Sequence, residues 1–81
     1  MNEHEAAALA QFVKDHDKRF TAAVQTSGGD FSVPFTRADD RTELPPVRTL
    51  DEYHQAHIEQ NDPGPTVRAA WEKWQPRPDA G

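Results

Sequence analysis

The chain has 81 residues, a formal net charge of −5 and no cysteine. Its length allows a single domain with a thin core, and the lack of cysteine excludes disulfides and thiolate metal sites. The acidic balance argues against direct binding to nucleic acid, since such binding depends on lysine and arginine side chains that neutralise phosphates.

A first helix is predicted from Asn2 to about Lys18. Asn2 can accept a hydrogen bond from the amide of Glu5, and the Glu5 carboxylate can return to the Asn2 amide, which makes a capping box. Residues at helical spacing then form the stripe that should face the core: Ala6, Leu9, Val13, His16 and Phe20, with Phe12 beside them.

A β-hairpin should follow, because apolar and polar residues alternate on both sides of a polar turn with two glycines. The alternating apolar residues are Phe20, Ala22 and Val24, then Phe31, Val33 and Phe35. Symmetric pairing places Val24 opposite Val33 and Ala22 opposite Phe35. All four then lie on one face, and this agreement sets the register.

Pro34 selects the turn between the two strands. With a two-residue turn at the glycines, Pro34 and Ala23 would form a hydrogen-bonded pair, and proline has no N–H to donate. A four-residue loop from Ser27 to Asp30 keeps the register but turns the Pro34 nitrogen away from its partner, as on an edge strand. We therefore expect the four-residue loop.

The last third predicts two helices, at about 50–60 and 66–75. Thr49 can cap the first of them, because Thr-x-x-Glu forms a capping box with Glu52. A segment with two prolines and one glycine separates the two helices. Residues 76–81 have nothing to bury and should form a mobile tail.

Between the hairpin and these helices, the sequence predicts a polar connector over residues 36–43. Pro45 and Pro46 then hold the chain extended, and Val47 can add a short third strand. Residues 1–75 are therefore predicted to form one small α+β domain. It is an antiparallel β-hairpin, with the third strand as an option, packed by three helices in the order α-β-β-α-α.

Two histidines, His54 and His57, lie one helical turn apart in the predicted second helix. Two imidazoles at this spacing can share a zinc ion, but a site needs a third and usually a fourth ligand, and the sequence has no HExxH pattern. Packing of His57 against apolar residues of its own helix is the simpler interpretation. A structural or regulatory metal site at His54 and His57 stays the alternative, and we predict no cofactor.

Motifs of catalysis and of DNA reading are also missing. Ser27 and Ser32 lie in no nucleophile motif such as GxSxG. Asp39 and Asp40 lie in a polar segment that offers neither burial nor a charged neighbour, and a carboxylate needs one of these to become a useful acid or base. The last two helices carry more acidic than basic residues, so a helix-turn-helix would be repelled by phosphates. We expect no enzymatic activity.

Four aromatic residues are the predicted partner-binding residues. Trp71 and Trp74 share one apolar stripe of the last helix. Tryptophan is common at interface hot spots, but in a chain this small it also builds the core, which we favour here. Phe31 and Phe35 lie on the hairpin, whose edge is the other exposed candidate for pairing.

The sequence thus favours a small acidic, non-enzymatic accessory or inhibitor-like module that binds another protein. A partner with a basic surface fits the net charge. The bias towards Ala, Asp, Arg and Pro is typical of a GC-rich bacterial or phage genome. No apolar stretch approaches the roughly 18 residues of a membrane span, and no signal-peptide core follows the acidic first residues. We therefore expect a cytoplasmic protein without membrane contact.

Overall fold

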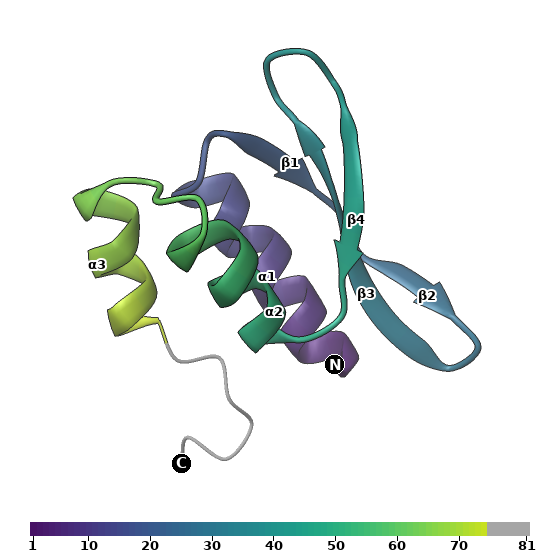
Figure 1. Ribbon diagram of the computed structural model, residues 1–81. Helices are drawn as coiled ribbons and strands as arrows, with labels where there is room; N and C mark the ends of the chain where they lie inside the picture. Colours follow the sequence, from purple (N-terminus) through teal and green to yellow (C-terminus); the bar gives the residue numbers. More distant parts are fainter. Residues whose placement is uncertain (75–81) are drawn as a thin grey trace.

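The computed structural model describes residues 1–74. In it, a four-stranded antiparallel sheet has helices packed on one face (Figure 1). The strands are β1 (Phe20–Ala22), β2 (Gln25–Ser27), β3 (Asp30–Arg37) and β4 (Glu43–Val47). The helices are α1 (Glu3–Asp15), α2 (Leu50–His54), which continues into the π-helical turn η1 (Gln55–Glu59), and α3 (Pro65–Lys73). The predicted α+β fold is therefore confirmed, and the optional third strand is present as β4. The predicted tail lies outside the described residues.

Helix α1 begins with the predicted capping box. The Glu5 amide donates to Asn2 Oδ1 at 2.8 Å, and the Asn2 amide donates to Glu5 Oε1 at 3.2 Å. The helix ends at Asp15 rather than near Lys18. It stops there because the His16 backbone leaves the helical region, with φ −122°, and the next residue, Asp17, is buried in the interior.

The turn between β2 and β3 has two residues, so the predicted four-residue loop is wrong. Ser27 pairs directly with Asp30. Gly28 and Gly29 both have positive φ, 59° and 90°, which is the conformation of a type I′ turn, the preferred connection of a tight hairpin. The predicted register is nevertheless confirmed where Ala22 pairs with Phe35.

Pro34 lies in the central strand β3 and not on an edge, which corrects the prediction. β1 and β2 pair with β3 in one continuous register and therefore lie along the same side of it, and β4 pairs with the other side. The Ala23 amide donates to the Pro34 carbonyl at 3.4 Å, but Pro34 has no N–H to return, and the first strand is split into β1 and β2 at this point. Val24 lies in the gap and is 41% exposed, so the predicted pair of Val24 and Val33 is not part of either ladder, although the register on both sides of the gap places the two residues opposite each other.

Strand β4 covers the other edge of β3 through an irregular ladder. Val33 pairs with Val47 and Phe35 pairs with Leu44, and a register shift lies between these pairs. A bulge of this kind absorbs the extra residue that Pro45 and Pro46 bring to β4. The same two prolines leave this edge without two of its N–H donors.

The turn η1 is held by two arginine side chains as well as by its own backbone. The Gln60 amide donates to the Gln55 carbonyl at 3.0 Å. Arg19 Nη2 donates to the His57 carbonyl at 2.6 Å, and Arg68 Nη1 donates to the Ile58 carbonyl at 2.9 Å. Carbonyl groups at a helix end lack helical partners, and here the guanidinium groups supply the donors.

The core lies between the helices and the covered face of the sheet. Its buried apolar residues are Ala6, Leu9, Phe12, Val13, Val33, Phe35, Val47, Tyr53, Ile58 and Val67. They come from α1, β3, β4, the second helix and α3, so the core joins elements from the whole described chain. Within residues 1–74, no helix is both long and apolar enough to cross a membrane.

Replacement of Thr49 by alanine tests the cap of α2. The Thr49 hydroxyl accepts from the Glu52 amide at 3.0 Å, and only this half of the predicted capping box is formed in the described part of the chain. We expect Thr49→Ala to lower the free energy of unfolding by about 1 kcal/mol in urea denaturation. Thr49→Ser keeps the acceptor and should stay near wild type. An alanine variant as stable as wild type would contradict the cap.

Candidate functional site

The Asp17 carboxylate is the one charged group buried in the described structure, with 1% of the residue exposed. Arg19 binds it through two hydrogen bonds, Nε to Oδ1 and Nη2 to Oδ2, both 2.8 Å long. The Tyr53 hydroxyl donates to Oδ2 at 2.8 Å. Burial disfavours the charged form of Asp17, but the Arg19 and Tyr53 hydrogen bonds outweigh it and hold its pKa below the usual range.

Arg19 extends this network to the far end of η1. Besides Asp17 and the His57 carbonyl, it binds the Asn61 carbonyl through Nη1 at 2.8 Å. Its guanidinium carbon lies 4.8 Å from the centre of the Phe20 ring, which is a cation–π contact. One side chain therefore connects the segment after α1 to the second helix.

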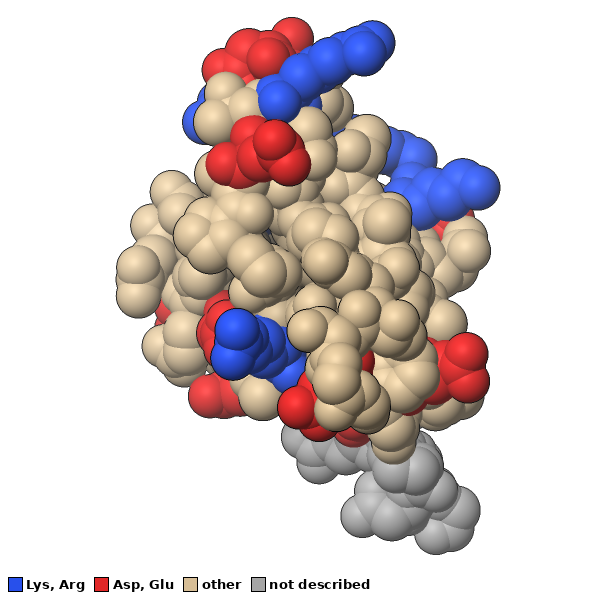
Figure 2. Space-filling model, turned by 90° about the vertical axis from the view of Figure 1, so that its right-hand side faces the viewer, with Lys and Arg blue, Asp and Glu red and all other residues tan. Residues whose placement is uncertain are grey.

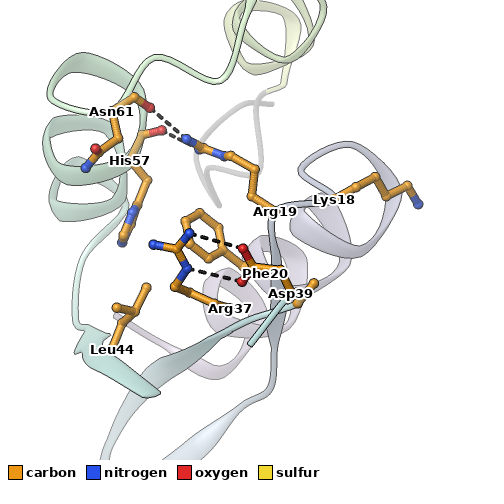
Figure 3. A pocket seen from close by; sticks show the side chains of 9 residues that line it. Lys18, Arg19, Phe20, Arg37, Asp39, Leu44, His57 and Asn61 are labelled. Carbon is orange, nitrogen blue, oxygen red and sulfur yellow. Dashed lines mark hydrogen bonds and ion pairs between the residues drawn. The ribbon is translucent and has the colours of Figure 1, made fainter. Parts of the chain in front are cut away.

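An open pocket lies beside this network where three segments far apart in the sequence meet (Figure 3). It has a volume of about 600 Å³. The lining comes from the start of β1 and the residues before it, from the β3–β4 hairpin, and from η1 and the residues after it: Lys18, Arg19, Phe20, Arg37, Ala38, Asp39, Leu44, His57 and Asn61. Figure 3 shows the Lys18 side chain directed away from the pocket, while Arg37 and His57 reach into it.

The charged wall of the pocket is an exposed ion pair between Arg37 and Asp39. Arg37 Nε and Nη2 each donate to Asp39 at 3.3 Å, and Asp40 lies 3.8 Å from Nε. The prediction that these aspartates have no charged neighbour is wrong, because the β3–β4 hairpin brings the Arg37 side chain to them. The Arg37 hydrogen bonds hold the pKa of Asp39 below its usual range.

The other wall is the His57 ring, which lies among aromatic side chains. It stacks on Phe35 with ring centres 5.1 Å apart and an interplanar angle of 7°, and the Phe20 ring meets it edge-on at 4.9 Å. His57 Nδ1 is buried and has no hydrogen-bond partner among the described residues. Burial, followed by repulsion from the Arg19 cation, lowers the pKa of His57.

This arrangement gives the pocket little catalytic chemistry. No serine, threonine, cysteine or tyrosine is among the residues that line it. Asp39 is kept ionised by Arg37, and His57 is kept neutral, so each group is held in a single protonation state near pH 7. The pocket can hold a ligand by contact with its apolar floor and with the Arg37 guanidinium.

The two histidines of the alternative metal site have different surroundings. The His54 ring stacks on Trp71 with centres 6.0 Å apart, and its Nε2 lies 3.5 Å from Glu59. His57 instead packs on Phe35. Within residues 1–74, no group of three or more histidine, aspartate or glutamate side chains is placed to hold a metal ion.

Trp71 and Trp74 are half-buried at the border of the core. The Trp71 ring centre lies 5.0 Å from that of Tyr53 and 5.5 Å from that of Phe12. The Trp74 ring lies 5.0 Å from Phe12, and Trp74 also lines a shallow groove with His16 and residues of α3, among them Ala70. Each ring thus packs on the core with part of its surface and leaves another part accessible.

The two phenylalanines of the hairpin have different positions. Phe35 is 1% exposed and belongs to the core, so in this structure its ring is not available to a partner. Phe31 is half-buried, packs against the border of the core and lines a hollow with Met1 and Arg48. Of these two predicted contact residues, only Phe31 reaches the surface.

The uncovered face of the sheet carries no charged residue in its centre. Alternation from the buried pair of Ala22 and Phe35 sends the intervening side chains to this face. They are Thr21, Ala23, Gln25, Ser32, Pro34, Thr36, Pro45 and Pro46, all exposed or half-buried. Figure 2 shows this face, with uncharged residues in the middle and charged residues around the border.

No protein family, curated protein or solved structure matches this chain.

Removal of the Asp17 carboxylate should destabilise the fold strongly. We expect Asp17→Ala to lower the free energy of unfolding by about 3 kcal/mol or more, because it leaves the partly buried Arg19 without its counter-ion. Tyr53→Phe removes one hydrogen bond to a charged group and should cost about 2 kcal/mol. Both are measured by urea denaturation. If Asp17→Ala does not fold, Tyr53→Phe decides, and a cost near zero would contradict the network.

The low pKa of His57 predicts a loss of stability on acidification. The unfolded chain binds a proton at His57 near its ordinary pKa of 6.5, whereas the folded chain resists it. The contribution of neutral His57 to the free energy of unfolding is therefore complete above pH 6.5 and declines as the pH falls below 6.5. His57→Phe keeps an aromatic ring and removes the titration. The stability difference between wild type and variant should be constant above pH 6.5 and change below it. A difference constant from about pH 7.5 to about pH 5 would refute this.

Proposed function

We propose that this chain is a small non-enzymatic module that binds another protein through the uncovered face of its sheet. The supporting observation is the uncharged centre of that face, in a chain in which 28% of the residues are charged. The centre of a protein interface is typically depleted of charged residues and surrounded by a polar rim. A flat face built on backbone ladders is also rigid, which reduces the entropy lost on binding.

Acidic residues at the border of the uncovered face support a partner with a basic surface. Asp30 and Glu43 lie at the ends of the strands that form this face, whereas Asp39 and Asp40 in the adjoining turn are paired with Arg37. With the net charge of −5, this favours a partner whose surface is basic, and association with it should weaken as salt rises. Cytoplasmic location and a bacterial or phage origin stay predictions of the sequence.

The groove of α3 is the second candidate surface for the same function. Trp74 and Ala70 line it together with His16, and tryptophan is frequent at interface hot spots. The rings of Trp71 and Trp74 are also partly used by the core, which leaves less of them for a partner. We therefore rank the face of the sheet first.

The test compares two substitutions that add the same charge. Immobilised chain is used to capture proteins from a lysate of the organism that encodes it, and the captured protein is identified by mass and purified. Ala23→Glu introduces a carboxylate on the uncharged face, next to Pro34 of the central strand, and Ala7→Glu introduces one on the exposed side of α1. We expect Ala23→Glu to weaken binding about tenfold or more, or about 1.4 kcal/mol, and Ala7→Glu to leave it unchanged.

Other outcomes separate the alternatives. Equal binding by Ala23→Glu and wild type, together with loss of binding by a folded Trp74→Ala variant, would move the contact to the α3 groove. A Trp74→Ala variant that unfolds would instead assign that ring to the core. Turnover of a small molecule by the purified chain, abolished by one side-chain change, would reject the binding-module proposal.

A further inference from the structure

The first strand of the sheet has an edge that no other segment of residues 1–74 pairs with. In an antiparallel ladder, hydrogen-bonded pairs alternate with pairs whose N–H and C=O groups point away from the partner strand. Hydrogen bonds join Ala23 to Pro34 and Ala38 to Arg19, and the same register continues where Gln25 pairs with Ser32 and Ser27 with Asp30. The backbone groups of the even-numbered residues from 20 to 26 therefore point outward. Within residues 1–74, the outward groups of Ala22, Val24 and Thr26 have no hydrogen-bond partner.

This edge runs on as one line although β1 and β2 are separate strands. Ala22 pairs with Phe35, and Gln25 pairs with Ser32, so the register is the same on both sides of the gap. The edge carries neither proline nor charged side chains, which are two of the features that commonly protect an open edge. Residues 20–27 read Phe-Thr-Ala-Ala-Val-Gln-Thr-Ser.

The opposite edge of the sheet is closed to pairing. Strand β4 carries Pro45 and Pro46 in succession, and neither has an N–H to donate. Each molecule therefore has one edge that can accept another strand and one that cannot. A sheet that grows through the open edge alone stops after two molecules, because both outer edges are then the proline edges.

We propose that the chain forms a twofold-symmetric dimer in which the 22–26 edges of two copies pair as antiparallel strands. The twofold axis passes at Val24, which lies opposite Val24 of the second copy, and Ala22 lies opposite Thr26. Each of these pairs exchanges two backbone hydrogen bonds. This inference is independent of the proposed function, because it uses the backbone edge and not the side chains of the outer face.

The side chains at this edge fit a second copy. Val24 is the only large apolar residue of the described chain that is exposed, at 41%, and the pairing places two of these valines side by side. β-branched residues pack well across neighbouring strands. Since residues 20–27 carry no charge, identical edges meet without repulsion, as a symmetric contact requires.

Figure 1 shows the β2–β3 hairpin projecting beyond the helices. Phe31, which pairs with Thr26, is half-buried there. Pairing of two copies would bring each Phe31 near the joined valines and extend the apolar covering past the edge of the helices.

Sedimentation equilibrium of the full chain tests the dimer. An edge of this length buries less than the roughly 1,200 Å² of a standard interface, so we expect a Kd of about 10⁻⁵ to 10⁻⁴ M. Measurement from about 10 μM to about 1 mM covers this range. A chain that is still monomeric at the highest concentration overturns the proposal.

Three variants assign the contact to the edge. Val24→Lys brings two ammonium groups together at the twofold axis and should raise the Kd at least about tenfold. Gln11→Lys makes the same change in charge on the exposed side of α1 and should leave the Kd unchanged. Val24→Thr keeps a β-branched uncharged side chain and should still dimerise. A dimer equally stable in Val24→Lys and wild type overturns the proposal.

Hydrogen exchange on the wild type gives a readout that needs no variant. The amides of Ala22, Val24 and Thr26 point outward and should exchange fast in dilute solution. At high concentration the pairing should protect these three amides, while the inward amide of Ala23 changes little. This result decides the question if Val24→Lys fails to fold. Exchange at the three amides that does not depend on concentration, in a chain that does dimerise, places the contact elsewhere and overturns the proposal.

Discussion

The buried contact between Asp17 and Arg19 is the interaction on which the rest of this structure depends. An isolated carboxylate in the interior would cost several kcal/mol, and here two Arg19 hydrogen bonds and one from Tyr53 satisfy it. The same guanidinium binds backbone carbonyls at the end of the second helix. One cation therefore satisfies a buried anion and also fixes the position of that helix against β1. The contact of His57 with Phe35 and the pocket beside it follow from this placement.

Proline gives the two edges of the sheet different properties. Pro34 removes one donor from the middle of the first ladder, and the strand beside it divides at that point. Pro45 and Pro46 remove donors from the outer side of β4 and produce a bulge against β3. The uncovered face thus gains three rigid, uncharged side chains. Residues 22–26 contain no proline, so their outward backbone N–H and C=O groups can still pair with another strand.

Local rules recovered much of the fold from the sequence, and the failures have physical causes. The box at Asn2 and Glu5 and the pairing of Ala22 with Phe35 depend on residues close in sequence or on simple alternation. The turn between β2 and β3 differs from the prediction because two adjacent glycines favour a tight turn more than the missing N–H of Pro34 disfavours it. A neutral hydrogen bond contributes only about 1 kcal/mol, so the tight glycine turn prevails. The contact of Tyr53 with Asp17 joins positions 36 apart, and no periodicity in the sequence encodes it.

The titratable groups at the pocket already have partners within the fold or are kept neutral by burial. The Arg19 guanidinium donates its hydrogen bonds to Asp17 and to backbone carbonyls. Asp39 is paired with Arg37, and burial keeps His57 neutral. Most remaining acidic side chains are exposed on the helices and turns, where they interact with solvent. Among the described residues, the centre of the uncovered face and the open edge of the sheet carry neither charges nor covering segments. They are the places where another protein can contact this chain without separating ion pairs that the fold already uses.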